Sequence, residues 1–160
     1  EVVGVDAARR MLDRAKRKTD GASVVANVRY QEADMYRLPF ADDVFDAITI
    51  GFGFRNLKRY DDALQEMVRV LRPGGCIAIL EFAPPANGWR GFLYQLYLWN
   101  IPVLATLLSG NLSEYRYLGS SIQCFLSPGE MLTLLRKYGV KHTTGTNIFF
   151  NGVYLYTGCL

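Results

Sequence analysis

The sequence has few cysteines, little net charge and a single histidine. Its three cysteines, Cys76, Cys124 and Cys159, are far apart and odd in number, so they indicate neither a disulfide framework nor a zinc site. The formal net charge of +3 is small for 160 residues, and its spread along the chain argues against an electrostatic surface for nucleic acid. We therefore expect a reducing compartment and no nucleic-acid partner.

The beginning of the chain lacks the marks of a secreted protein. No charged segment leads into an apolar one, and the first residue is Glu1 rather than Met, so neither a signal peptide nor a native start is visible. The opening letters, EVVGVD, are typical of a buried strand that ends in a carboxylate, Asp6. We expect that a preceding segment is missing and that residues 1–160 form a single, partial domain.

Charged and aromatic residues are unevenly divided along the chain. Residues 1–80 hold 25 of the 33 charged residues, whereas residues 81–160 hold 14 of the 21 aromatic ones. No charged residue lies between Arg90 and Glu114, but polar residues, a proline and two glycines interrupt this stretch, so we do not predict a membrane span. We predict instead that 89–126 is a helical, aromatic insertion over the substrate side.

Apolar strands alternate with amphipathic helices along most of the chain. The predicted strands are 2–6, 28–32, 45–50, 76–82, 140–146 and 153–157, and the predicted helices are 7–18, 61–71 and one that a capping box begins at Ser127. Alternation with buried strands predicts a parallel, doubly wound α/β sheet of the Rossmann-like class.

Asp6 stands at the carboxyl end of the first predicted strand. In a doubly wound sheet a carboxylate at this place can bind a ribose, but it can equally cap the helix that begins at Ala7. A nucleotide site also needs a glycine-rich loop, and none precedes Asp6 in this chain. Because the strand that carries such a loop is central in this topology, we expect its absence to split the sheet and leave the site incomplete.

Four segments together resemble one enzyme family. They are LPFADDVFDAITIGFGFRN at 38–56, DDALQEMVRVLRPGG at 61–75, LEFAPP at 80–85 and EYRYLGSSI at 114–122. In this order they are similar to the ubiquinone/menaquinone biosynthesis C-methyltransferases of the UbiE and MenG type, which are class I enzymes that use S-adenosylmethionine. The resemblance covers nearly the whole chain.

The resemblance implies a set of cofactor contacts. Asp6 would bind the ribose of S-adenosylmethionine, Asp34 and Met35 the adenine, and Gly51 the region near the methionine. The family commonly has Asn-Ala in place of Asp34-Met35 and Ser in place of Gly51. The side chains that would contact the adenine and the methionine part therefore differ chemically from those common in the family. The family also tends to carry His where this chain has Tyr156.

The resemblance further implies C-methylation of a prenylated quinol ring, either demethylmenaquinol or 2-polyprenyl-6-methoxy-1,4-benzoquinol, without a metal. Arg55 could stabilise the phenolate because a guanidinium stays charged and donates in a fixed fork. The proton acceptor is left open between a water ordered by Arg55 and Asn56 and the side chains of Glu114, Tyr115 or Tyr117.

The sequence is compatible with several alternatives. Arg55 could instead form a surface salt bridge with Asp61 or Asp62, and the aromatic segment 89–108 could be a buried helix rather than a cover that also meets lipid. The chain could belong to another small-molecule methyltransferase, to an NAD-dependent oxidoreductase or to a non-catalytic remnant. We expect a cytoplasmic protein, peripheral at the inner face of the membrane, with a homodimer as an open alternative.

Overall fold

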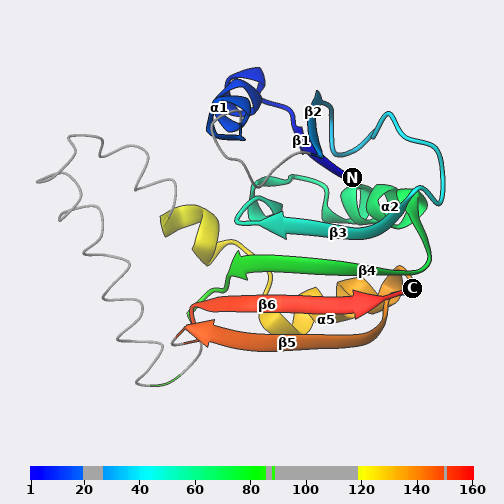
Figure 1. Cartoon of the computed structure of the whole chain (residues 1–160). Coiled ribbons are helices and arrows are strands. Elements are labelled where there is room, and N and C mark those ends of the chain that lie inside the picture. The colour runs from blue at the N-terminus through cyan, green and yellow to red at the C-terminus, as the bar shows by residue number, and fades with distance from the viewer. Residues whose placement is uncertain (20–26, 86–87, 89–118, 150) are drawn as a thin grey trace, which may run out of the picture.

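The computed structural model describes residues 1–19, 27–85, 88, 119–149 and 151–160. In chain order the elements are β1 (Val2–Asp6), α1 (Arg9–Thr19), β2 (Val28–Glu32), β3 (Phe45–Gly51), η1 (Phe54–Asn56), α2 (Tyr60–Val70), β4 (Leu71–Phe82), α5 (Pro128–Lys137), β5 (Lys141–Phe149) and β6 (Val153–Cys159) (Figure 1). The predicted strands and helices are confirmed to within a few residues, except that β4 begins earlier than expected.

The strands form two sheets rather than one. β1 and β2 pair in parallel, while β3, β4, β6 and β5 form a second sheet in that order (Figure 1). The predicted division of the sheet is therefore confirmed, because β1 and β3 belong to different sheets. The predicted parallel sheet is wrong in its last part, because β6 runs antiparallel to both β4 and β5. The short connection from β5 to β6 reverses the chain and makes this sheet mixed.

The apolar core lies on one face of the four-stranded sheet. Alternate residues of β4 are buried, as period-two side-chain direction requires for a strand with one covered face. Helices α2 and α5 supply the facing side chains, and residues just before α5 join them. The cluster comprises Phe54, Leu64, Met67, Leu71, Ile77, Ile79, Phe125, Met131, Leu135, Val140 and Tyr156.

Arg69 ties the loop before β3 to helix α2. Its guanidinium donates to the carbonyl oxygens of Leu38 and Phe40 at 3.1 and 2.9 Å, and it forms ion pairs with Asp42 and Glu66. The Arg69 hydrogen bond is the main reason that the pKa of Glu66 lies below its usual range. The LPFADD and RVLRPGG segments are thus joined by one side chain.

Cys76 and Cys159 form a disulfide, which corrects the absence of a disulfide expected from the sequence. The two residues lie 83 positions apart, so their spacing gave no signal. The antiparallel register of β4 and β6 places them directly opposite each other. Cys124 is a free, exposed thiol.

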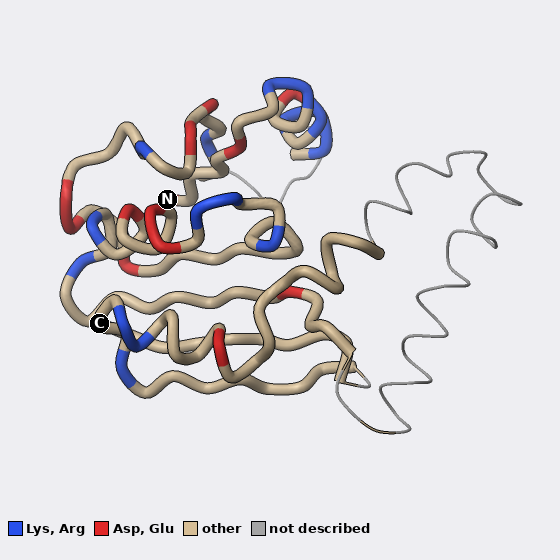
Figure 2. The backbone as a smooth tube through the Cα atoms, turned by 180° about the vertical axis from the view of Figure 1, so that it is seen from behind, with Lys and Arg blue, Asp and Glu red and all other residues tan. Residues whose placement is uncertain are grey.

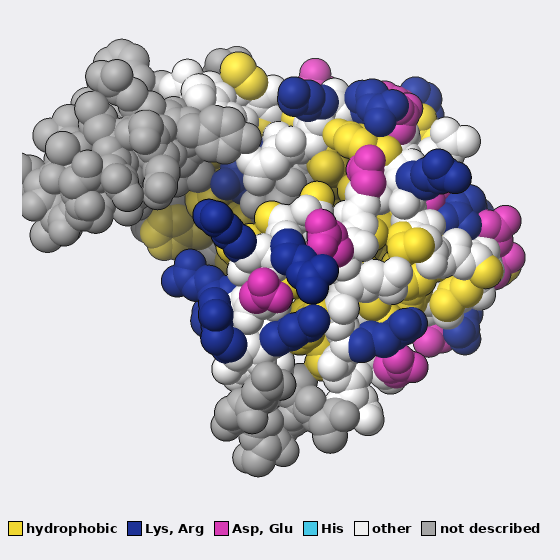
Figure 3. Space-filling view, turned by 90° about the horizontal axis from the view of Figure 1, so that it is seen from above, with side chains coloured by type: hydrophobic (Ala, Val, Ile, Leu, Met, Phe, Trp, Pro, Cys, Tyr) yellow, Lys and Arg dark blue, Asp and Glu magenta, His cyan; other side chains and the backbone are white. Residues whose placement is uncertain are grey.

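Charge is concentrated in the first half of the molecule, as the sequence indicated. Figure 2 shows coloured segments crowded around α1, the β1–β2 sheet and α2, whereas β6 and most of β4 and β5 are uncoloured. From above, Lys and Arg side chains lie among acidic and apolar ones (Figure 3). The last turn of α1 carries Lys16, Arg17 and Lys18, which suit the negative end of a helix dipole. Among the described helices, none is long and apolar enough to span a membrane.

Removal of the α5 cap should weaken the fold. Ser127 accepts a hydrogen bond from the Glu130 backbone, and the Glu130 carboxylate accepts one from the Ser127 backbone. We expect Ser127→Ala to lower the free energy of unfolding by about 1 kcal/mol because the Glu130 backbone N–H loses its acceptor, the Ser127 hydroxyl. Thr133→Ala, in the exposed middle of the same helix, is the control and should cost nothing. Equal urea midpoints for Ser127→Ala and the unsubstituted protein would contradict this assignment.

Candidate active site

The candidate site lies at the carboxyl ends of β3 and β4. These strands run in parallel, with Gly51 opposite Leu80, so the segments that follow them meet at the same edge of the sheet. The Phe52 backbone extends this pairing by donating to the Leu80 carbonyl at 2.8 Å. The chain then turns into η1, which presents Arg55 and Asn56 beside the end of β4.

Arg55 and Glu81 form a buried ion pair at this edge. Nη1 of Arg55 lies 2.7 Å from Oε1 of Glu81, and the two side chains are 10% and 0% exposed. The other carboxylate oxygen accepts the backbone N–H of Arg55 at 3.1 Å, and Oε1 also accepts that of Phe82 at 2.8 Å. A buried carboxylate needs such donors to offset the loss of hydration. Glu81 therefore fixes both the side chain and the backbone of Arg55.

The alternative surface pairing of Arg55 is wrong. Asp61 instead pairs with Lys137 and accepts a hydrogen bond from Tyr138, and Asp62 pairs with Arg59. The Lys137 hydrogen bond is the main cause of a lowered pKa for the Asp61 carboxyl. The residue that the sequence prediction missed is Glu81. Its signal was present, because it is the one charged residue in the apolar stretch CIAILEF.

Arg55 also organises the turn after β3. Its Nη1 donates to the Phe52 carbonyl oxygen at 2.7 Å, and its Nε lies 3.4 Å from the Ser121 hydroxyl. Asn56 reaches the same Phe52 carbonyl at 3.5 Å. No described residue accepts a hydrogen bond from Nη2 of Arg55. The guanidinium is thus held in place while one of its nitrogens can still donate to a ligand.

The predicted cofactor residues after β1 and β2 lie at one sheet edge. The backbone N–H of Ala33 donates to the Asp6 carbonyl at 3.2 Å, which brings the two strand ends together. Oδ1 of Asp6 accepts the Ala8 N–H at 2.7 Å in a turn that precedes α1, and because α1 begins at Arg9 this bond is not the helix cap weighed for Asp6. No described residue bonds its Oδ2. Asp34 accepts the Tyr36 N–H at 3.0 Å and forms a tight turn.

The remaining predicted site residues have different surroundings. Met35 is partly buried and packs against the core. Gly51 is exposed, and a Cβ built there would meet no atom within 4 Å, so this position has room for a ligand or for the Ser that the family commonly carries. Glu114, Tyr115 and Tyr117 lie outside the described residues, as does most of the predicted insertion at 89–126.

The end of that insertion belongs to the core. Ile122 is fully buried and Phe125 is 5% exposed, and the Phe125 ring packs edge-on against Phe54 and Tyr60. Ser121, one residue before Ile122, is the hydroxyl that Arg55 approaches. The segment after residue 118 therefore connects the core to the candidate site.

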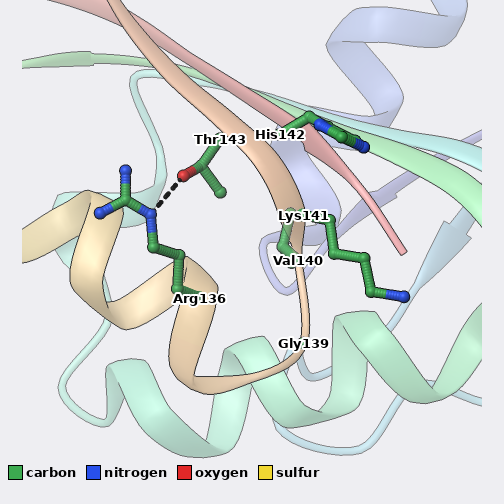
Figure 4. A pocket seen from close by; sticks show the side chains of 6 residues that line it. All are labelled: Arg136, Gly139, Val140, Lys141, His142 and Thr143. Atoms are coloured by element: carbon green, nitrogen blue, oxygen red, sulfur yellow. Dashed lines mark hydrogen bonds between the residues drawn. The ribbon is translucent and has the colours of Figure 1, made fainter.

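The hollow between α5 and β5 does not form a convergent site. It is lined by Arg136, Gly139, Val140, Lys141, His142 and Thr143. Figure 4 shows that Arg136 turns toward Thr143, to which its Nε donates at 2.7 Å, while the Lys141 and His142 side chains point in other directions. Its basic groups share no common centre at which a ligand could be held.

Tyr156 occupies the core beneath the site. Its side chain is fully buried, and its hydroxyl has no hydrogen-bond partner among the described residues. Burial is the main cause of a raised pKa for this phenol, with a smaller contribution from the nearby Tyr154 and Glu81. Tyr156 is therefore a neutral core residue, in the position where the family tends to carry His.

The chain is similar to solved methyltransferases in its fold. A SAM-dependent methyltransferase from Aquifex aeolicus superposes with a TM-score of 0.68 and 17% identity, over 99% of this chain and 68% of the other. The [4+2]-cyclase SpnF superposes with a TM-score of 0.61 and 16% identity, over 99% and 65%. At this identity the likeness defines the fold alone, and the cyclase shows that the fold does not fix the reaction. The fold class is that of a Rossmann-like class I methyltransferase.

Sequence similarity narrows the class to a family. The ubiE/COQ5 methyltransferase family matches residues 1–158. The chain is 45% identical to a demethylmenaquinone methyltransferase of Thermus thermophilus over 87% of this chain and 63% of that protein. It is 37% identical to the ubiquinone/menaquinone biosynthesis C-methyltransferase UbiE of Azotobacter vinelandii over 93% and 56%. The chain belongs to the ubiE/COQ5 methyltransferase family, and it spans about three fifths of the length of these relatives.

The Arg55–Glu81 pair should behave as a buried charge pair. We expect Arg55→Ala to lower the free energy of unfolding by about 3–5 kcal/mol, because Glu81 is left without a counter-charge. The double variant Arg55→Gln/Glu81→Gln removes both charges and should recover most of that loss. Arg59→Ala breaks an exposed pair and is the control, with a loss below about 1 kcal/mol. If Arg55→Ala and Arg59→Ala unfold at the same urea concentration, the pair is not buried as described.

The unpartnered phenol of Tyr156 predicts an unusual pH dependence. Tyr156→Phe removes an unsatisfied hydroxyl, so at pH 7 we expect a gain of about 1 kcal/mol. As the pH rises past the unfolded pKa of about 10, the unfolded chain loses a proton that the native chain keeps, and the unsubstituted protein loses stability. At about pH 10.5 the advantage of Tyr156→Phe should therefore grow by about 1 kcal/mol. Denaturation at the two pH values tests this, and an advantage that shrinks with pH would contradict it.

Proposed function

We propose that the protein transfers a methyl group from S-adenosylmethionine to a ring carbon of demethylmenaquinol. Family membership supports the reaction class. The choice of quinol is supported by the relatives from Thermus thermophilus and Deinococcus radiodurans, which are 45% and 41% identical to this chain and are named demethylmenaquinone methyltransferases. 2-Polyprenyl-6-methoxy-1,4-benzoquinol is the second candidate, because relatives at 37% and 35% identity carry the joint ubiquinone/menaquinone name.

The described residues fit one side of S-adenosylmethionine. Oδ2 of Asp6, which bonds no described residue, can accept from a ribose hydroxyl. The turn at Asp34–Met35 can contact the adenine, and the open space at Gly51 can admit the methionine part. No glycine-rich loop lies next to Asp6 among the described residues. When bound, the cofactor supplies an electrophilic methyl group on a sulfonium.

Arg55 carries the proposed chemistry on the substrate side. A quinol ring carbon becomes strongly nucleophilic when the neighbouring hydroxyl is deprotonated, so the enzyme must stabilise a phenolate. Nη2 of Arg55 can donate to that oxygen, while Glu81 holds the guanidinium from the other side. A cation placed in advance in a largely buried site stabilises such charge far better than one in water. The Arg55–Glu81 geometry is the single observation that carries this proposal.

The proposed reaction balances without a redox step. The quinol hydroxyl first gives up its proton, and the ring carbon then forms a bond to the methyl carbon while the carbon–sulfur bond breaks with its electron pair staying on sulfur. The ring carbon next loses its own proton, the ring becomes aromatic again and the oxygen is reprotonated. The net products are a methylated quinol, a neutral thioether and one proton. A water near Asn56, or Glu114, Tyr115 or Tyr117, is the proposed acceptor of the hydroxyl proton.

The prenyl tail suggests a location for the protein. We propose that segment 89–118 covers the tail and contacts lipid, so that the protein works in the cytoplasm at the inner membrane face. Its aromatic composition and the lack of charged residues from 91 to 113 support this proposal. A homodimer is compatible with it and is not required by the site.

Binding and turnover together test the proposed function. The double variant Arg55→Gln/Glu81→Gln avoids a lone buried charge, so a loss of turnover in it reports on chemistry rather than unfolding. We expect its kcat to fall by about 10²–10³-fold, with calorimetric affinity for S-adenosylmethionine almost unchanged. Arg59→Gln is the matched control and should keep its kcat. The measurements use the protein that carries this sequence, with demethylmenaquinol as substrate.

Three results would contradict the proposal. Full turnover in the double variant would remove Arg55 from the mechanism. Calorimetric binding of NAD without any binding of S-adenosylmethionine would favour an oxidoreductase, and binding of neither would favour a non-catalytic protein.

A further inference from the structure

An exposed aromatic surface lies at the candidate site. Phe52 is 41% exposed although it follows a strand of the core, and its ring centroid lies 4.8 Å from that of Phe82 with an angle of 41° between the planes. Phe54, two residues later, is fully buried and stacks on Tyr60. The two phenylalanines of the FGF sequence therefore have different roles, and only Phe52 presents its ring at the ligand edge.

The backbone holds the Phe52 ring in this place against its own preference. Phe52 has a φ of 54°, in the left-handed region that bulky side chains rarely occupy. Its carbonyl accepts from Nη1 of Arg55 and lies within reach of Asn56, while its N–H donates to Leu80. Strain that neighbouring groups enforce at a sheet edge is a recurring feature of binding sites.

A cation stands beside the same aromatic surface. The guanidinium carbon of Arg55 lies 5.2 Å from the centroid of the Phe82 ring, which is within the range of a cation–π contact. The same guanidinium has Nη2 unbonded to any described residue. The edge thus offers the rings of Phe52 and Phe82 and, close beside them, a hydrogen-bond donor of Arg55.

We propose that Phe52 and Phe82 form the surface on which the hydroxylated aromatic ring of the substrate stacks. This inference rests on the proposed function and deepens it by naming the ring contact. An electrophile must approach a ring carbon perpendicular to the ring plane. Stacking on Phe52 and Phe82 covers one face, leaves the other for the methyl donor and brings a ring hydroxyl beside Arg55.

Substitution of Phe52 tests this contact with matched controls. Phe52→Leu removes the ring, and Phe52→Asn removes it while suiting the left-handed backbone. We expect both to raise KM about tenfold, equivalent to about 1.4 kcal/mol, for a naphthoquinol with a prenyl tail and for the same naphthoquinol without one. Phe52→Tyr, which restores a ring, should recover most of the loss. Calorimetric affinity for S-adenosylmethionine should not change.

Phe45→Leu is the control, because it also replaces a phenylalanine with leucine but at a position away from the ligand edge. Phe45 lies at the opposite end of β3, where its ring packs edge-on against Phe40. This variant should keep the KM of the unsubstituted protein for both quinols.

Three outcomes overturn the inference. An unchanged KM in both Phe52→Leu and Phe52→Asn would show that the ring is not a contact. A rise confined to the tailed quinol would assign Phe52 to the tail instead. If the unsubstituted protein binds neither quinol, the inference falls together with the proposed function, whereas normal turnover with insensitive Phe52 variants removes the inference alone.

Discussion

The buried ion pair between Arg55 and Glu81 fixes the geometry of the whole ligand edge. Glu81 is fully buried on the inner strand β4. Its carboxylate has therefore lost its hydration, and only the hydrogen bonds from its donors offset that cost. Two of those donors come from Arg55, one from the backbone and one from the side chain. The turn after β3 therefore has little freedom to adopt another conformation.

The other features of the site follow from that restraint. Once Arg55 is held, its Nη1 fixes the Phe52 carbonyl, and the Phe52 ring is directed onto Phe82 at the open edge. The same residues supply a cation, an aromatic surface and, in Nη2 of Arg55, a donor that bonds no described residue. The exposed pairs of the molecule, such as Arg59 with Asp62, have no comparable consequence because water can replace either partner. Burial of a single carboxylate distinguishes the two cases.

Most of the fold could be predicted from residue patterns, because its strands and helices have strong local signals. The strand Val28–Glu32 and the capping box at Ser127 were predicted at their observed positions. The antiparallel β6 and the Cys76–Cys159 disulfide could not be predicted in this way, since both depend on which strands pair across a long separation. Strand direction has no local signature in an apolar run.

The candidate site was predicted only in part. Arg55 was identified through its motif, but its partner was sought among nearby acidic residues, whereas Glu81 is 26 positions away and reachable only through strand pairing. The left-handed backbone of Phe52 is likewise set by tertiary hydrogen bonds and has no local signal, because the residue is neither Gly nor Asn. Tertiary constraints decided both features.

The most direct test is the fate of an isotopically labelled methyl group. The protein is incubated with S-adenosylmethionine carrying a trideuterated methyl and with demethylmenaquinol, and the product is examined by mass spectrometry and NMR. We expect an intact trideuteromethyl group on a ring carbon. Label on a quinol oxygen, or no transfer to a quinol by protein that binds S-adenosylmethionine, would contradict it.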